Sequence, residues 1–430
     1  MLSRKIKCIH ILIPLCIFAL SGCTSRESIK IPYNKPLPHG SLYRIGSFTL
    51  KRVNGELHFG QNRKYMKRGV NIAVLKGTPY EIGYSRGILL REEIEEWVKN
   101  MLYAIRKRSI GTSIGKNWMI RRAKKIDEFV PSEYREELRG MSDATEIDYH
   151  TLLMVNLLET IAHQFGCTSV AVKCSDGQLF RSHNQDGKKN SPYLGTWYLI
   201  IYKPTKGNAF VSVSAPGFIG VWTGMNENGL TFGSHNISGV RVPNAWQGIT
   251  TAILNRKVLQ YATSMKDAES ILKKLPRCAP RMFMVANARH ARIYEYDSKR
   301  IVCRDIRGDH LVLTNHTEKL HLGPKYPHSI VRFEQAQDFL VRNKHQMDLD
   351  KLIQLNRLDN ISWAFDPYTA NWNSTIFRPE TLDFWTAIQS PPASRRKYVG
   401  FSLMKESYGR GNDPTPIVIP AIDITKHMFY

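Results

Sequence analysis

The spacing of hydrophobic residues predicts helices in the first part of the chain. Thr78-Pro79-Tyr80-Glu81 has the form of a helix start, with a threonine cap, proline at the first position and glutamate three residues after the cap. An apolar stripe at helical spacing follows, formed by Leu90, Ile94, Trp97, Val98, Met101 and Leu102. Further helices are predicted over 116–129, 132–144 and 148–163. A hairpin over 43–59, turning at Asn54-Gly55, and a strand over 71–75 precede them, so we expect 41–166 to be mainly helical.

From residue 167 onward, strand-like runs dominate the pattern. The first of these runs cover 169–173, 179–184, 196–202, 209–214, 218–223 and 229–233. Helical spacing returns at 249–261 and 265–274. Later strands are predicted over 281–286, 291–296, 310–314, 374–377, 384–387 and 399–403. The chain is therefore expected to be α+β, with large antiparallel sheets and grouped helices, and its composition changes at Gly166/Cys167.

The N-terminus has the pattern of an export signal. Arg4, Lys5 and Lys7 precede an apolar stretch over 8–19, which is too short to span a bilayer as a helix. Leu20-Ser21-Gly22-Cys23 resembles the lipobox of bacterial lipoproteins, although an ordinary signal peptide with an incidental cysteine remains the alternative. We expect cleavage after Gly22, lipid on Cys23 and attachment to a membrane of the bacterial cell envelope, the outer one if the cell has two.

These boundaries predict four segments along the chain. They are a signal peptide (1–22), a polar tether (23–40), an N-terminal segment (41–166) and a segment that begins at Cys167 (167–430). The net charge of +24 falls to +21 when the three basic residues of the signal are removed. No nucleic-acid motif occurs, so this charge favours anionic lipid head groups or acidic substrates, or serves no specific partner.

Cysteine usage argues against a disulfide framework and against a metal site. Of seven cysteines, two leave with the signal and Cys23 is the predicted lipid site. The others are Cys167, Cys174, Cys278 and Cys303. A bridge between Cys278 and Cys303 is possible in an oxidising compartment, and the sequence does not decide it. Because no CxxC or HExxH spacing occurs, no metal or other cofactor is expected.

Cys167 begins a predicted hairpin. Ser175-Asp176-Gly177-Gln178 is typical of a two-residue type I′ turn, because Asp-Gly tolerates positive φ angles. With 175 opposite 178, the register places Asp186 opposite Cys167 and His183 opposite Val170. A thiol with a carboxylate beside it indicates a nucleophile and its orienting partner. A buried structural cysteine is the alternative reading of the same residues.

Three further residues are candidates for the chemistry. Asn236 and Asn315 are expected at strand ends, where each is either a donor to an oxyanion or an ordinary turn asparagine. Arg332 is a candidate for holding an acidic substrate group or the nucleophile region, with a surface charge as the alternative.

Taken in order, these motifs resemble the isopenicillin-N acyltransferase-like family of N-terminal-nucleophile hydrolases, related to choloylglycine hydrolases, penicillin V acylases and acid ceramidases. The resemblance covers most of the chain after the signal. It is carried by residues 77–83, Arg86-Gly87, residues 136–140, Gly166-Cys167-Thr168, His183-Asn184-Gln185-Asp186, residues 225–230, Thr314-Asn315-His316 and Arg332. It implies a four-layer αββα sandwich and a precursor that cuts itself between Gly166 and Cys167.

The resemblance also implies a role for each matching residue. Cys167 matches the nucleophile, Asp186 the aspartate near its new amino group, Asn236 and Asn315 the oxyanion asparagines, and Arg332 the arginine of the site. Choloylglycine hydrolases have arginine where His183 aligns, which favours the acyltransferase branch and leaves substrate recognition at His183 open. The freed α-amine, with an intrinsic pKa of about 8, suits a base for the thiol.

The expected enzyme is a C–N hydrolase of linear amides, or an N-acyltransferase, that passes through a thioester on Cys167. Its expected substrate is a small amphiphilic N-acyl amide, with Phe165, Phe218 and Trp222 lining an acyl pocket unless they are plain core. An anionic head group would suit Arg332. One alternative is a non-catalytic surface lipoprotein that keeps the fold for binding.

The other alternative is a Cys/His peptidase. It would use Cys167 with His183, His235 or His316. It is less favoured because Cys167 begins a predicted strand instead of a helix, whose N-terminus would lower the thiol pKa. The oligomeric state is left open.

Overall fold

The computed structural model describes most of the chain after the predicted tether. The described residues are 28–29, 48–108, 113–161, 166–189, 191, 195, 197–237, 239–240, 247–361, 368–423 and 425. The predicted signal peptide lies outside them, and of the predicted tether only Ser28–Ile29 is described, as a short strand.

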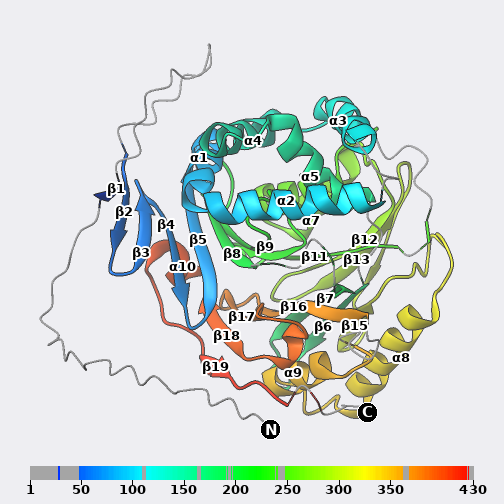
Figure 1. Ribbon diagram of the computed structural model, residues 1–430. Helices are drawn as coiled ribbons and strands as arrows, with labels where there is room; N and C mark the ends of the chain where they lie inside the picture. Colours follow the sequence, from blue (N-terminus) through cyan, green and yellow to red (C-terminus); the bar gives the residue numbers. More distant parts are fainter. Residues whose placement is uncertain are drawn as a thin grey trace, which may run out of the picture.

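Two sheets stack face to face at the centre of the molecule (Figure 1). Within the described residues the larger has 12 strands in the order β1-β2-β3-β4-β5-β8-β9-β10-β11-β12-β13-β14, and the smaller has seven in the order β15-β6-β7-β16-β17-β18-β19. The larger sheet contains β1 (Ser28–Ile29), β2 (Leu50–Val53), β3 (Glu56–Phe59), β4 (Asn62–Lys67), β5 (Val70–Gly77), β8 (Tyr198–Pro204), β9 (Phe210–Ser214), β10 (Thr223–Asn226), β11 (Thr231–His235), β12 (Arg281–Ala286), β13 (Ala291–Tyr296) and β14 (Ile301–Asp305). The smaller contains β6 (Gly166–Lys173), β7 (Leu179–Lys188), β15 (His310–Leu313), β16 (Thr369–Arg378), β17 (Asp383–Ala387), β18 (Tyr398–Ser402) and β19 (Val418–Ile419).

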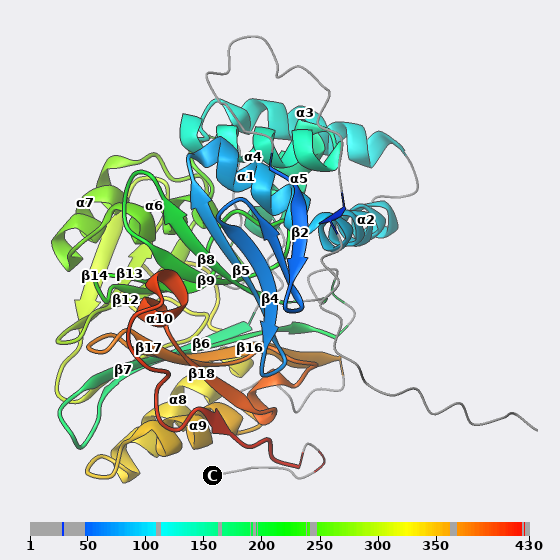
Figure 2. The ribbon, with the colours of Figure 1, turned by 90° about the vertical axis from the view of Figure 1, so that its left-hand side faces the viewer.

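Helices cover the outer face of each sheet. Beyond the larger sheet lie α1 (Pro79–Leu89), α2 (Arg91–Arg108), α3 (Ser113–Asp127), α4 (Ser132–Thr145), α5 (Tyr149–Ile161), α6 (Thr251–Tyr261) and α7 (Met265–Lys274). Beyond the smaller sheet lie α8 (Pro327–Arg342) and α9 (Leu349–Arg357). The other described helical elements are a short 3-10 helix (Ala393–Arg395) and α10 (Leu403–Tyr408). Figures 1 and 2 show the resulting order helices–sheet–sheet–helices, which confirms the predicted α+β fold with four αββα layers.

Local sequence signals placed the first elements correctly. Asn54 and Gly55 both take positive φ at the turn between β2 and β3. At the start of α1, the Glu81 backbone N–H donates to Thr78 Oγ1, and the Thr78 N–H donates back to Glu81 Oε2 at 2.7 Å. This reciprocal capping satisfies donors that a helix end leaves unpaired, which is why α1 begins where the Thr-Pro-Tyr-Glu run predicts.

The predicted strand over 218–223 is wrong. Arg86, buried on α1, donates to the carbonyl oxygens of Ala215, Pro216 and Phe218 at 2.6–2.9 Å. These oxygens therefore serve a side chain instead of a strand ladder, and β10 begins only at Thr223. The edge strand β14 and the helices α8 and α9 were not predicted.

The predicted segments 41–166 and 167–430 contribute strands to the same sheet. β5, from the N-terminal segment, pairs in parallel with β8, from the segment that begins at Cys167, with Asn71 opposite Tyr198 and Gly77 opposite Pro204. The other strand pairs of both sheets, among the described residues, are antiparallel. The backbone ladder between β5 and β8 therefore joins the parts of the chain on either side of Gly166.

A buried ion pair strengthens the same junction. Arg256 on α6 contacts Glu137 on α4 at 2.6 Å and also donates to the carbonyl oxygen of Ile219. Nearby, Asn156 on α5 accepts a hydrogen bond from the Ile219 backbone N–H at 2.9 Å. Because both partners are buried, removing one would leave an unpaired charge inside the protein.

The disulfide that the sequence left open can be compared with the described residues. Cys303 carries a free thiol, so the Cys278–Cys303 bridge left open by the sequence is not formed in this structure. Within the described ranges, none of the helices combines the length and apolar character needed to cross a membrane.

Candidate active site

Five of the predicted site residues meet at the N-terminal end of β6: Cys167, Asp186, Asn236, Asn315 and Arg332. Figure 2 shows this strand, which belongs to the smaller sheet. Cys167 is the second residue of this strand and is 3% exposed. Its backbone N–H, which belongs to the Gly166–Cys167 peptide bond, donates to Asn315 Oδ1 at 2.9 Å. Asn315 follows β15, the direct neighbour of β6, so strand pairing delivers the asparagine to the start of β6.

Arg332 is fully buried on α8 and binds the same strand. Its guanidinium donates to the Cys167 carbonyl oxygen, to Thr168 Oγ1 at 3.1 Å and to Asn315 Oδ1 at 2.6 Å. The helix is tied to the same loop, because the Asn315 backbone N–H donates to Ser329 Oγ at 2.8 Å. The arginine therefore holds the start of β6, around Cys167, and is not a surface charge.

The predicted register of the β6–β7 hairpin is wrong by one residue. The observed pairs include Gly166 with Asp186, Cys167 with Gln185, and Ser169 with His183. The loop holds three residues instead of two, since the Cys174 N–H bonds to the Gln178 carbonyl oxygen and Gly177 takes φ +81° between them. Because side chains alternate along a strand, this shift places Asp186 and the Cys167 side chain on opposite faces of the sheet.

Asp186 lies instead opposite Gly166, beside the peptide bond that we expect to be cut. Its Oδ1 accepts a hydrogen bond from Asn371 Nδ2 at 2.8 Å, and its Oδ2 has no hydrogen-bond partner among the described residues. Burial raises the pKa of Asp186 to about 7, against the opposing effects of the Arg332 charge and the Asn371 hydrogen bond. The carboxyl group is thus set to titrate near neutral pH, next to the position where a new α-amine would form.

A bulge in β16 gives Asp186 its partner. Asn371 pairs with Asp186 and Asn373 pairs with Gln185, so one extra residue separates the two asparagines. In a regular strand residues two apart share a face, whereas the bulge lets Asn371 serve Asp186 while Asn373 Nδ2 donates to Gln185 Oε1 at 3.0 Å.

Asn236 presents a hydrogen-bond donor at this site. It follows β11 and is 4% exposed, and its carbonyl oxygen accepts from Asn315 Nδ2 at 2.9 Å. Its own side-chain Nδ2 is buried without a hydrogen-bond partner among the described residues. An unsatisfied buried donor is costly, so this amide is suited to an oxygen that is present only when substrate is bound.

The three candidate histidines are held in a neutral state. Burial, together with the charge of Arg181, keeps the pKa values of His183 and His235 well below the usual range. His183 Nδ1 and His235 Nε2 both bond to Ser169 Oγ, at 2.9 and 2.8 Å. Burial likewise lowers the pKa of His316 to about 4. An imidazolium–thiolate pair, as in a Cys/His peptidase, is therefore disfavoured.

Two of the three aromatic residues predicted to bind an acyl chain lie within the described residues. Phe218 and Trp222 are buried and stacked, with ring centroids 4.0 Å apart, and Trp197 packs on Trp222 at 5.5 Å. They belong to the same apolar cluster as Cys167. Phe165 lies outside the described residues.

Sequence reasoning missed Asn371, Ser169 and Arg181. Nothing in the sequence signals Asn371, because its role depends on a bulge. Arg181 could have been predicted, because it lies two residues before His183 and alternate residues of a strand share a face. Ser169 could have been found in the same way, two residues after Cys167.

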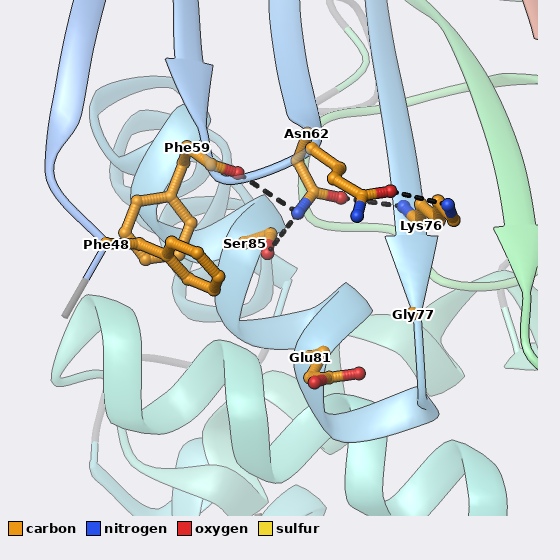
Figure 3. Close-up of a pocket in the computed structure, with 8 residues that line it drawn as sticks. Phe48, Phe59, Asn62, Lys76, Gly77, Glu81 and Ser85 are labelled. Atoms are coloured by element: carbon orange, nitrogen blue, oxygen red, sulfur yellow. Dashed lines mark hydrogen bonds between the residues drawn. The ribbon is translucent and has the colours of Figure 1, made fainter. Parts of the chain in front are cut away.

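A surface cavity elsewhere does not include any of these groups. Figure 3 shows it between the β3–β4 hairpin and α1, and its lining includes Phe48, Phe59, Gln61, Asn62, Lys76, Gly77, Glu81 and Ser85. Asn62 Nδ2 donates to the Phe59 carbonyl oxygen and to Ser85 Oγ, and Asn62 Oδ1 accepts from the Lys76 backbone N–H. These polar groups stabilise the hairpin against α1.

Comparison with known proteins identifies the family. Residues 172–391, just over half of the chain, match the family described as acyl-coenzyme A:6-aminopenicillanic acid acyl-transferase. The chain belongs to this family. The family resemblance seen in the sequence motifs is thereby confirmed, whereas nothing in the comparison bears on the predicted lipid anchor.

Curated relatives share a limited part of their length with the chain. An uncharacterized protein of Archaeoglobus fulgidus is 30% identical over 247 residues, which cover 50% of this chain and 41% of that protein. The N-acylethanolamine-hydrolyzing acid amidase of Oryctolagus cuniculus is 25% identical over 38% of this chain and 47% of its own. The acid ceramidase of Heterocephalus glaber is 26% identical over 35% and 44%. The chain thus spans about half, or less, of these relatives.

Solved structures with some similarity include two hydrolases. A Caenorhabditis elegans ortholog of N-acylethanolamine-hydrolyzing acid amidase aligns with a TM-score of 0.39 and 15% identity, covering 50% of this chain and 93% of that one. A variant of the conjugated bile acid hydrolase of Clostridium perfringens aligns with a TM-score of 0.44 and 14% identity, covering 60% and 100%.

Proposed function

We propose that the protein is an amidohydrolase or N-acyltransferase that uses Cys167 as an N-terminal nucleophile after cutting its own chain. The observation that carries this proposal is the arrangement around the Gly166–Cys167 peptide bond. Asn315 binds its N–H, Arg332 binds the next carbonyl oxygen, and Asp186 lies opposite Gly166. Membership of the acyl-transferase family supports the same reading.

The self-cleavage step would begin with the Cys167 thiol. Its sulfur attacks the Gly166 carbonyl carbon, the C–N bond breaks, and the nitrogen leaves with a proton as the new α-amine of Cys167. Water then hydrolyses the thioester, which releases the Gly166 carboxylate and restores the thiol. Gly166 has no Cβ to obstruct the approach of the sulfur.

In the mature enzyme the new amine would act as the base. It takes the thiol proton while the sulfur attacks the substrate amide carbon, and it returns that proton to the leaving amine. The Asn236 amide would donate to the oxyanion of the tetrahedral intermediate, which its Nδ2 supports by having no hydrogen-bond partner among the described residues. The resulting acyl thioester then passes its acyl group to water or to a second amine.

The substrate we propose is a small amphiphilic N-acyl amide. The stacked Phe218 and Trp222 are buried in the same large apolar core as Cys167, and in this proposal they line the acyl pocket. The names of the related acid amidase and acid ceramidase point to the same class of substrate. Arg332 already donates to Cys167, Thr168 and Asn315, so we assign it to the nucleophile region, and the basic charge of the chain remains the support for an anionic head group.

A hydrolysis panel on cleaved protein tests this substrate class. The panel contains N-acyl amino acids, neutral N-acyl amines of matched chain length and casein-like peptides. Control compounds carry the same head groups without an acyl chain. We expect acyl amides to be turned over at least ~10-fold faster than peptides, because burying each extra methylene contributes ~0.8 kcal/mol. Peptides that outpace every acyl amide would reject the proposal, and equal rates for charged and neutral head groups would remove only the anionic preference.

We also propose that lipid on Cys23 anchors the enzyme to a membrane, where amphiphilic substrates collect. Cys23→Ser is expected to abolish labelling by a radioactive fatty acid and to move the protein from the membrane fraction to the soluble fraction. Cys174→Ser, which alters a buried thiol far along the chain, should leave labelling unchanged. If Cys23→Ser protein still sediments with membranes as the native protein does, the basic surface or a partner holds it there.

A non-catalytic binding protein is the remaining alternative. It would keep a single intact chain and would have no need for a carboxyl group that titrates near neutral pH beside the Gly166–Cys167 bond. The number of chains in mature protein therefore separates the two readings.

A further inference from the structure

Arg181 is a buried cation between the two sheets for which the described residues supply no carboxylate. It lies on β7 and is fully buried, and its Nη1 donates to Thr223 Oγ1 on β10 of the facing sheet at 2.8 Å. Its Nε and Nη2 have no hydrogen-bond partner among the described residues. The guanidinium also lies over the ring of Phe377, 5.4 Å from the centroid.

The facing sheet makes room for this side chain. A Cβ added at Gly233 on β11 would lie 1.5 Å from Arg181 Nη2, so any larger residue there would collide with the guanidinium. Burying an unpaired charge costs several kcal/mol, and an apolar side chain would fill the same space at less cost. Stability therefore does not explain why arginine occupies this position.

Neighbouring hydrogen bonds keep the two histidines beside Arg181, His183 and His235, uncharged. His235 Nδ1 must carry a proton to bond to the Thr314 carbonyl oxygen at 3.0 Å, so its Nε2 accepts from the Ser169 hydroxyl. The Ser169 oxygen in turn accepts from His183 Nδ1. Both rings are thus neutral with fixed tautomers, while burial lowers the pKa of Arg181 only to about 9, which leaves it charged at neutral pH.

Among the described residues, Cys167 is the group whose charge, when its thiol is ionised, acts on Arg181. Residues 181, 183 and 185 share one face of β7, and Cys167 pairs with Gln185, so thiol and guanidinium face the same layer between the sheets. Both groups are buried, and charges act more strongly in a protein interior than in water.

The other charged or titratable groups around Cys167 are already engaged. Arg332 reaches it from α8, where its charge is shared between Asp186 and Cys167 and its donors are taken by protein oxygens. His235 reaches it from β11 and is neutral. The α-amine formed by cleavage is the proton acceptor of the proposed mechanism and adds a positive charge once it is protonated.

We propose that Arg181 is a positioning residue that adds a buried positive charge on the Cys167 side of the layer between the sheets and so favours the ionised form of the thiol. Arg181 forms and breaks no bond, because the thiol proton goes to the α-amine and the sulfur keeps the electron pair. The inference rests on the proposed function, in which Cys167 is the nucleophile.

The test compares Arg181→Met with native protein across pH 5 to 10. Alkylation of Cys167 by iodoacetamide, followed by mass spectrometry of the Cys167 peptide, and the rate of self-cleavage are both measured. We expect the midpoints of both profiles to rise by about one pH unit, which lowers both rates about tenfold at pH 7. Arg181→Lys should restore most of the loss, and the melting temperature of Arg181→Met should equal or exceed that of the native protein.

Lys173→Met is the matched control. It removes the same charge from the other end of β6, where the side chain is exposed, and it should leave both profiles unchanged. If Arg181→Met precipitates, Arg181→Gln keeps a polar group and is measured in the same way.

The outcomes separate this inference from the proposed function. Unchanged pH profiles in folded Arg181→Met or Arg181→Gln protein would overturn the inference, and so would a lowered melting temperature without rescue by Arg181→Lys, which indicates a structural role. If Cys167→Ala protein is still cut or still active, the proposed function itself fails.

Discussion

Cys167→Ala is expected to leave one intact chain in place of the two fragments, 23–166 and 167–430, that we expect from the native protein. Without the sulfur, no group replaces the attack on the Gly166 carbonyl carbon, so cleavage should slow by at least ~10³-fold. N-terminal sequencing and intact mass of purified protein measure this directly. The native material should yield a fragment that begins with Cys167.

Cys174→Ala provides the control for this experiment. Cys174 is also buried on the same hairpin, and burial raises the pKa of its thiol to about 12. It should therefore be an inert structural cysteine, and its variant should be cut as the native chain is. Cleavage of Cys167→Ala at the same position would mean that a separate protease makes the cut.

Asp186→Asn is expected to fold and to lose activity by ~10²-fold or more. Asparagine keeps the shape of the side chain but cannot carry the charge that would orient the new α-amine of Cys167. Turnover of an N-acyl amide by cleaved protein measures the loss. Asp338→Asn, which changes an exposed carboxyl group on α8, should leave turnover unchanged. Near-native turnover by cleaved Asp186→Asn would reject the role.

The same substitution should alter the pH dependence of stability in the uncut Cys167→Ala chain. The pKa of Asp186 is about 7 when folded against 3.8 as its ordinary value, so the folded state holds the extra proton and loses stability as pH rises between these values. At about 1.4 kcal/mol per unit, the loss is up to ~4 kcal/mol by pH 7.5. Urea unfolding should show that Asp186→Asn removes this loss and has little effect at pH 4.

Elements with strong local signals were predictable from the sequence. The capping box at Thr78 and the Asn54-Gly55 turn depend on residues that touch their near neighbours in the chain, and both formed as expected. The αββα layers followed from the ordered motifs of the family. Cys167, Asn315 and Arg332, predicted from separate motifs, are joined by direct hydrogen bonds.

The remaining features depend on contacts that a linear pattern does not contain. The hairpin register turned on one residue, because Asp176-Gly177 suits a two-residue turn as well as the three-residue loop that formed. The strand expected over 218–223 was lost to Arg86, which is 130 positions away from Pro216. Asn371 reached Asp186 only through a bulge, and such irregularities have no signature in hydrophobic spacing.

If the chain is cut after Gly166 as proposed, the parallel pairing of β5 with β8 has a consequence for the lifetime of the mature enzyme. Before the cut, both strands belong to one molecule, and refolding after a transient opening is a first-order process. After the cut, the same ladder joins two separate polypeptides, so reassembly depends on their concentration and competes with aggregation of each half. Self-cleavage would therefore be irreversible as a covalent change, and it would also make unfolding of the mature enzyme hard to reverse. An enzyme that unfolds once in a dilute compartment is lost, and its persistence is governed by its unfolding rate instead of its equilibrium stability.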